Sequence, residues 1–99
     1  MKKVNNFIAG KIKCFSQNYL PIFDPSKGEK IGDVVNSNEK DFEEILKSAK
    51  KGFNEWSEFT PLKRSRVLSN FKSIIEKNIS TLAPIVSEEH GKTIEDAKG

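Results

Sequence analysis

The stretch from Thr60 to Asn78 constrains the fold most, because its apolar residues keep one helical period over its length. Thr60 can accept a backbone N–H as N-cap, and Pro61 stands at the first helical position, where its missing N–H costs no hydrogen bond. The pattern predicts a helix whose apolar stripe must be buried against another surface. The stripe is expected to consist of Leu62, Val67, Leu68, Phe71, Ile74 and Ile75.

A second amphipathic helix is predicted before this one. Asn38 can cap it, and Asp41 stands three residues on as a shorter variant of the capping-box acid. Gly52 lies inside the pattern at a cost of about 1 kcal/mol relative to alanine, so either the helix frays there or something packs close to the backbone, and close packing is the favoured expectation. The apolar positions are Phe42, Ile45, Leu46, Ala49 and Phe53, with Trp56 at the end.

Two shorter helices are predicted to follow. Ser80 or Thr81 restarts a helix that runs through Val86, and Gly91 ends it as a left-handed cap. Thr93, with Asp96 three residues on, opens the last helix.

The first 36 residues are predicted to form two β-hairpins. Ala9-Gly10 supplies the tight turn of a hairpin between Val4 and Phe15. The second hairpin joins strands at 19–23 and 30–35 through an Asp-Pro-Ser-Lys-Gly turn, and Pro21 predicts an edge position because it donates no ladder hydrogen bond. No strand–helix–strand alternation follows, so no parallel sheet is expected. The predicted fold class is α+β, with hairpins in 1–36 and three to four helices in 37–99.

The chain offers too little polypeptide to cover these surfaces. A chain of 99 residues buries only roughly 60–65% of the surface that its unfolded form exposes. The two long apolar stripes could face each other, but the hairpins and the last helix would then lack a covering layer. We therefore interpret residues 1–99 as the opening segment of a larger domain.

Composition excludes several classes of protein. The chain is 35% hydrophobic with a mean hydropathy of -0.57, and no apolar run approaches the ~18 residues of a membrane span. Its basic start is interrupted by Asn5, Asn6 and Gly10, which predicts a mature cytosolic terminus. The lone Cys14 fits a reducing compartment.

The charge pattern does not favour nucleic acid as a partner. Seventeen basic and fourteen acidic side chains give a net charge of +3, and the two signs are interspersed. Lys50-Lys51 and Lys63-Arg64-Arg66 are interpreted as solvated helix faces, so neither nucleic acid nor membrane is expected as a partner.

Three groups of residues invite a chemical interpretation. Cys14 could be a nucleophile, but no histidine or carboxylate stands near it in sequence, so a strand residue is the favoured interpretation. Glu88-Glu89-His90 could serve acid–base or metal chemistry, yet consecutive helical residues diverge, and His90 suits the last turn of a helix. Gly91-Lys92-Thr93 matches the end of a phosphate-binding loop, but Val86 replaces its first glycine. We expect no catalytic, cofactor-binding or metal-binding residue in this chain.

Several short strings, taken in order and spacing, resemble the opening of an aldehyde dehydrogenase. The strings are Phe7-Ile8-Ala9-Gly10-Lys11, Asp24-Pro25-Ser26-Lys27-Gly28-Glu29-Lys30-Ile31-Gly32, Ala49-Lys50-Lys51-Gly52-Phe53 with Trp56, Arg64 to Leu68, and Glu89-His90-Gly91-Lys92-Thr93 with Asp96-Ala97-Lys98-Gly99. The resemblance runs from about Asn6 to Gly99. The final string is most similar to the coenzyme A-acylating branch, the methylmalonate-semialdehyde dehydrogenases. Asp24 departs from the asparagine that is common in the family.

The resemblance implies an enzyme of several hundred residues. Its reaction would be NAD-dependent oxidation of methylmalonate or malonate semialdehyde, with thioester formation on a cysteine and transfer to coenzyme A. That cysteine would lie after this segment, and Cys14 does not match it. The segment would form the outer part of the α/β cofactor-binding domain, with the rest of the chain as its partner, in a cytoplasmic homo-oligomer. Alone it would be inactive.

Two alternatives stay open. One is another aldehyde dehydrogenase branch, such as one acting on succinate semialdehyde. The other is a non-catalytic helical interaction module that kept the N-terminal fold and binds a partner through its uncovered faces.

Overall fold

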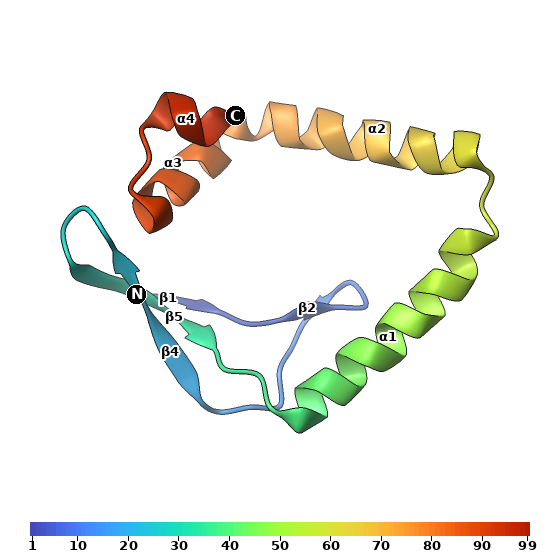
Figure 1. Cartoon of the computed structure of the whole chain (residues 1–99), viewed down its shortest axis with the longest axis horizontal. Coiled ribbons are helices and arrows are strands. Elements are labelled where there is room, and N and C mark those ends of the chain that lie inside the picture. Colours follow the sequence, from blue (N-terminus) through green and yellow to red (C-terminus); the bar gives the residue numbers. More distant parts are fainter. The chain divides into compact units, whose positions relative to one another are not determined.

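The computed structural model describes all 99 residues, and their contacts divide the chain into two compact units. The first unit contains Met1–Ile22 and Lys30–Glu58, and the second contains Phe23–Glu29 and Phe59–Gly99. The predicted α+β class is confirmed, with short strands followed by four helices (Figure 1).

A three-stranded sheet in the first unit contains a pairing that the sequence did not predict. Strand β1 (Lys2–Val4) lies beside β5 (Glu29–Val35), which pairs on its other edge with β4 (Tyr19–Asp24). The β1–β5 pair is parallel, with Lys2 opposite Gly32, so the expectation of no parallel pairing was wrong. The expected edge position of Pro21 is confirmed, because β4 is an outer strand.

The first hairpin is smaller than expected and forms its own two-stranded sheet. Strands β2 (Phe7–Ile8) and β3 (Lys11–Ile12) are antiparallel, with Ile8 opposite Lys11. The turn residues Ala9 and Gly10 have φ of 52° and 78°, as a two-residue hairpin turn requires. Val4, expected in this hairpin, belongs to β1 instead.

Helix α1 (Glu39–Ser57) begins as predicted. Asn38 accepts from the Asp41 amide, and Asp41 accepts from the Asn38 amide, which completes the capping box. The helix continues through Gly52, and a side chain built there would meet no atom within 4 Å. The expected close packing at Gly52 was therefore wrong.

The second unit is built from three helices. Helix α2 (Pro61–Lys77) starts at the predicted cap, where Thr60 Oγ accepts from the Lys63 amide at 3.2 Å. Leu62 lies about two and a half turns before Phe71, so it faces away from the stripe that it was expected to join. None of the residues of α2 is buried within the chain.

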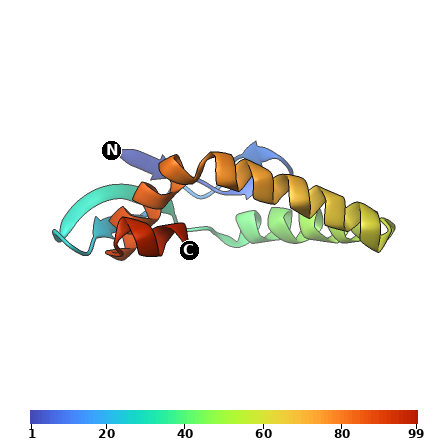
Figure 2. The same cartoon turned by 90° about the horizontal axis from the view of Figure 1, so that it is seen from above.

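The third helix begins earlier than predicted. Helix α3 (Ile79–His90) follows α2 directly, and Asn78 separates the two without a side-chain cap for α3. The Asn78 side chain instead donates to the Ile74 carbonyl oxygen at 2.8 Å, so it serves the end of α2. Neither Ser80 nor Thr81 is the cap. Helix α4 (Ile94–Lys98) starts at Thr93 as expected and packs on α3 (Figure 2).

Gly91 ends α3 in the predicted left-handed conformation, with φ of 71°. A side chain there would also lie 3.2 Å from Pro25 Cγ, in the turn between β4 and β5. The left-handed backbone therefore favours glycine, and the contact with Pro25 leaves little room for a side chain. The turn itself is held by Asp24, whose carboxylate accepts from the Ser26 amide at 2.8 Å.

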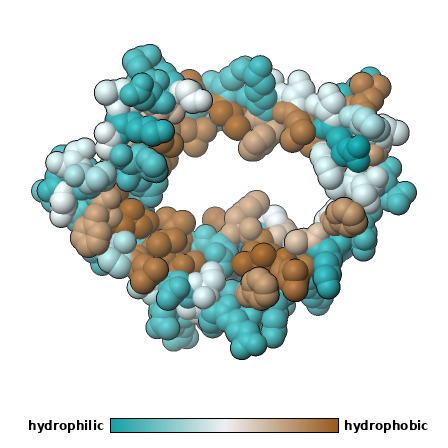
Figure 3. Space-filling view, viewed as in Figure 1, coloured by the Kyte–Doolittle hydropathy of each residue, from teal (hydrophilic) through white to brown (hydrophobic).

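Little of the apolar surface is buried. The buried hydrophobic residues are Ile8, Val35 and Ala83, whereas large apolar side chains of both long helices are exposed. Figure 3 shows these hydrophobic side chains open at the surface. None of the four helices combines the length and apolarity that crossing a membrane requires.

Candidate functional site

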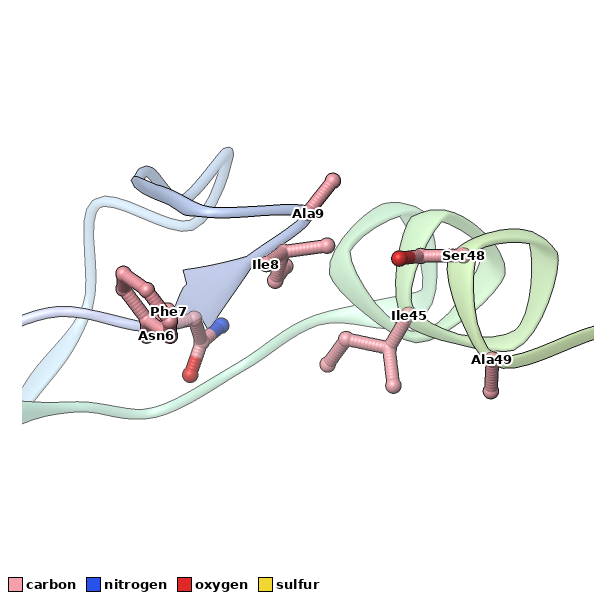
Figure 4. A pocket seen from close by; sticks show the side chains of 7 residues that line it. All are labelled: Asn6, Phe7, Ile8, Ala9, Ile45, Ser48 and Ala49. Atoms are coloured by element: carbon pink, nitrogen blue, oxygen red, sulfur yellow. The ribbon is translucent and has the colours of Figure 1, made fainter. Parts of the chain in front are cut away.

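A groove lies between the β2–β3 turn and α1 in the first unit. It has a volume of about 290 Å³. Ile8 and Ala9 from the hairpin approach Ser48, and Ile45 and Ala49 line the wall formed by the helix (Figure 4). The remaining lining residues are Asn6 and Phe7. The groove is therefore mostly apolar and holds no titratable side chain.

A second, smaller groove of about 150 Å³ shares Ile8, Ala9 and Ser48 with the first. Lys13 lies on its hairpin side and pairs with Glu44 of α1 at 3.5 Å. Lys47 and Lys51 complete its rim. The Lys13–Glu44 ion pair bridges the segment after β3 and the helix, and the two further lysines leave the rim of this groove positively charged.

Both grooves are small for a dinucleotide such as NAD. Ligand pockets for drug-sized molecules usually exceed ~300 Å³. The larger groove has no cation and no helix N-terminus to meet a pyrophosphate, which such sites commonly use. The expectation that this chain holds no cofactor-binding residue stays a prediction.

Asp41 joins the start of α1 to the segment that follows β3. Its carboxylate accepts from the Phe15 amide at 2.5 Å and from the Ser16 amide at 3.1 Å, besides its capping bond to the Asn38 amide. The side chain is 0% exposed. The hydrogen bond from Phe15, followed by those from Asn38 and Ser16, lowers the pKa of Asp41 below its ordinary value of 3.8, although burial opposes this shift. Asp41 is therefore a charged structural anchor.

Cys14 lies in a small polar cluster after β3, so the predicted position within a strand was wrong. Its thiol donates to Asn5 Oδ1 at 3.5 Å and lies 3.7 Å from the Tyr19 hydroxyl, which also donates to Asn5 Oδ1, at 2.7 Å. The hydrogen bond with Cys14, followed by burial, raises the pKa of Tyr19 above its usual 10.0. No histidine or carboxylate contacts the thiol to act as a base. The cluster connects the end of β1 to the start of β4.

The motifs near the C-terminal end are explained by helix termini. Glu88, Glu89 and His90 occupy the last turn of α3, and no three His, Cys, Asp or Glu side chains in the chain lie close enough to hold a metal ion. Gly91 follows a helix and Thr93 caps α4, whereas a phosphate-binding loop would follow a strand.

Sequence reasoning missed the second contact of Asp41 and the Asn5–Cys14–Tyr19 cluster. Each joins residues at least five positions apart that no local motif links. The sequence signal available for Asp41 was its capping-box spacing from Asn38, which predicts its bond to the Asn38 amide but not its bonds to Phe15 and Ser16.

Comparison with known proteins identifies the fold. The model of the aldehyde dehydrogenase family matches residues 13–99. A protein from Sinorhizobium meliloti 1021, described as a methylmalonate-semialdehyde dehydrogenase and solved with NAD, has a TM-score of 0.93 and 37% identity, and the match covers 100% of this chain and 20% of that one.

Two relatives show how widely the sequence similarity extends. A Dictyostelium discoideum protein named as a probable acylating methylmalonate-semialdehyde/malonate-semialdehyde dehydrogenase of mitochondria is 36% identical over 94% of this chain and 18% of its own. The 2-aminomuconic semialdehyde dehydrogenase of Bos taurus is 38% identical over 92% of this chain and 18% of its own. The chain thus spans about a fifth of the length of the relatives that it matches. On the strength of the family match and the shared fold, this chain belongs to the aldehyde dehydrogenase family.

Proposed function

We propose that this chain is a segment of an NAD-dependent, coenzyme A-acylating enzyme that oxidises methylmalonate or malonate semialdehyde. The observation that carries the proposal is the likeness to the Sinorhizobium protein, which extends over all of this chain and whose structure contains NAD. The acylating chemistry is supported by the name of the Dictyostelium relative.

The substrate class follows from what the relatives' names share. Each is named for a semialdehyde, a molecule that carries a carboxylate besides the aldehyde. A second candidate is a different semialdehyde branch, favoured by the 38% identity to the Bos taurus 2-aminomuconic enzyme. Succinate semialdehyde belongs to the same chemical class and is a further substrate to test.

Within such an enzyme the segment would serve as structure. Its charged anchor, Asp41, and its polar cluster hold strands and helix together, and both grooves are small for a dinucleotide. We propose that NAD, coenzyme A and the reactive cysteine are supplied by other parts of a homo-oligomeric, cytoplasmic enzyme, and that residues 1–99 alone are inactive. The free thiol of Cys14 supports a reducing compartment.

The test uses the polypeptide that carries this segment, purified from its source cells with an antibody against residues 1–99. NADH formation is measured with methylmalonate, malonate, succinate and 2-aminomuconic semialdehydes, each with and without coenzyme A. We expect coenzyme A-dependent turnover with the first two. Turnover only with 2-aminomuconic or succinate semialdehyde would replace the proposed branch by another, and no turnover at all would overturn the enzyme assignment.

A further inference from the structure

The smaller of the two grooves combines an apolar hairpin side with a basic helix side. Ile8 is buried, and Ala9 stands next to it at the turn, where both approach Ser48 of α1 (Figure 4). All the lining residues belong to the first unit. Three lysines line the groove: Lys13, Lys47 and Lys51. The groove therefore places an apolar recess next to several ammonium groups.

The charges of the groove do not cancel. Its lining contains three ammonium groups and one carboxylate, that of Glu44, which pairs with Lys13 at 3.5 Å. Lys47 and Lys51 take part in no ion pair. They stand four positions apart on α1, so their side chains share one face of the helix. Both of their positive charges are therefore available to an anion in the groove.

The groove opens on the polar side of α1. At 100° per residue, Lys47 and Lys51 lie roughly opposite Phe42 and Phe53 around the helix axis, and both lysines are exposed. An amphipathic helix keeps its charged side in water when its apolar side is buried. A polypeptide that covers the apolar side of α1 would therefore leave this groove open.

The size of the groove limits what it can bind. Its volume is about 150 Å³. A cavity of roughly 150 Å³ is large enough for a benzene ring. An ammonium group forms strong, charge-assisted hydrogen bonds with carboxylate oxygens. A carboxylate attached to one ring-sized apolar group therefore matches both the volume and the charge of the groove.

We propose that the groove between the β2–β3 hairpin and the polar side of α1 is a binding site for small organic carboxylates. Lys47 and Lys51 bind the carboxylate, and the apolar group lies against Ile8 and Ala9. This inference goes beyond the proposed function, because it concerns binding at this surface and involves neither NAD nor coenzyme A.

Benzoate is the probe, and two matched compounds separate its parts. Acetate keeps the carboxylate without the ring, and benzyl alcohol keeps the ring without the charge. Each is titrated at constant ionic strength onto the full polypeptide that carries this segment. Acetylation of individual lysines by an N-hydroxysuccinimide ester is then measured by mass spectrometry. Lys50 is exposed but does not line the groove, so it is the internal reference.

We expect benzoate to slow the acetylation of Lys13, Lys47 and Lys51 at least about threefold, with half of the effect at a concentration on the order of 10 mM. Acetate and benzyl alcohol should each bind at least about threefold more weakly. Equal protection by acetate would show that the groove recognises charge alone and would overturn the proposal. Equal protection of Lys50 would overturn it as well, as would the absence of protection below about 100 mM benzoate.

A matched set of variants tests the two unpaired lysines. Lys47→Gln combined with Lys51→Gln removes both charges, and Lys50→Gln removes one charge from a residue outside the groove. All three positions are exposed and glutamine is a good helix former, so α1 should stay folded, as circular dichroism verifies.

The local readout in these variants is Lys13, which remains in the groove. In the double variant, benzoate should protect Lys13 from acetylation at least about fivefold more weakly than in the unchanged protein. In Lys50→Gln the protection should change less than about twofold. Undiminished protection of Lys13 in the double variant would overturn the proposal, as would equal losses in the two variants.

Discussion

At the scale of single residues, Asp41 shows how one side chain can serve two structures. As a capping-box acid it accepts from Asn38, and this role was predicted from its spacing. Its oxygens also accept from Phe15 and Ser16, which lie more than twenty positions earlier in the chain. Three backbone donors around one carboxylate favour its charged form.

Replacing Asp41 by asparagine should loosen the segment that follows β3. The neutral amide keeps one oxygen but cannot accept three backbone hydrogen bonds as the carboxylate does. We expect hydrogen exchange at the Phe15 and Ser16 amides to rise about tenfold. Glu43→Gln, which removes a charge from the exposed side of the same helix, is the control and should leave both amides unchanged.

The same carboxylate predicts a dependence of stability on pH. Because folding lowers the pKa of Asp41, its contribution is fully present above the ordinary value of 3.8 and is lost as pH falls through the lower pKa of the folded state. An acid titration followed by circular dichroism should therefore show a loss of structure below pH ~4 that is weaker in Asp41→Asn. Identical titrations of the two proteins would contradict this role.

At the scale of elements, the parallel pairing of β1 with β5 depends on Gly32. A Cβ atom at this position would lie 2.6 Å from Lys2 Cγ and 2.8 Å from the Lys2 carbonyl oxygen. Such distances exclude any side chain unless β1 moves away. The close approach explains why glycine stands in the middle of the central strand.

We expect Gly32→Val to release β1 while β4 and β5 stay paired. The loss of packing and of the parallel ladder should cost about 1–3 kcal/mol of unfolding free energy. Hydrogen exchange across residues 2–4 and urea denaturation, both of the polypeptide that carries this segment, measure the two effects. Gly52→Ala is the control and should raise the unfolding free energy. Its site is open, and alanine is more stable than glycine in a helix interior by about 0.5–1 kcal/mol. A fully protected β1 in Gly32→Val would show that the strand tolerates the side chain.

The two long helices show that an amphipathic pattern predicts a helix better than it predicts the helix's neighbour. Both α1 and α2 have the predicted caps, yet Phe71 of α2 is 59% exposed and Phe53 of α1 is 71% exposed. The period of the apolar residues indicates that one face of a helix is to be buried. It does not indicate which part of a polypeptide covers that face.

At the scale of the whole molecule, the exposed apolar side chains predict loose packing in isolation. Burial of a large apolar side chain is worth about 1.5–3 kcal/mol, and this stabilisation is missing wherever the side chain meets water. For purified residues 1–99 we expect partial helicity, binding of a hydrophobic dye and a broad thermal transition, features of a loosely packed state. Dispersed amide resonances with sharp, cooperative melting would contradict this expectation.

The sequence by itself determined most of the local structure. The confirmed predictions each depend on a few neighbouring residues. They are the second hairpin, the caps of α1, α2 and α4, the left-handed end of α3 and the edge position of Pro21. The family was also evident from the order of short strings, and the comparisons confirm it. No residue pattern pointed to a catalytic group, and that expectation remains a prediction.

Only the tertiary structure decided the remaining features. These features join residues that are distant in sequence. They are the parallel pairing of β1 with β5, the three donors around Asp41, the Asn5–Cys14–Tyr19 cluster and the packing of α1 through its polar side. Such contacts depend on how elements meet in space, whereas caps, turns and periods depend on the chemistry of adjacent residues. A one-dimensional pattern therefore specifies the elements, and their contacts emerge only when the chain is folded.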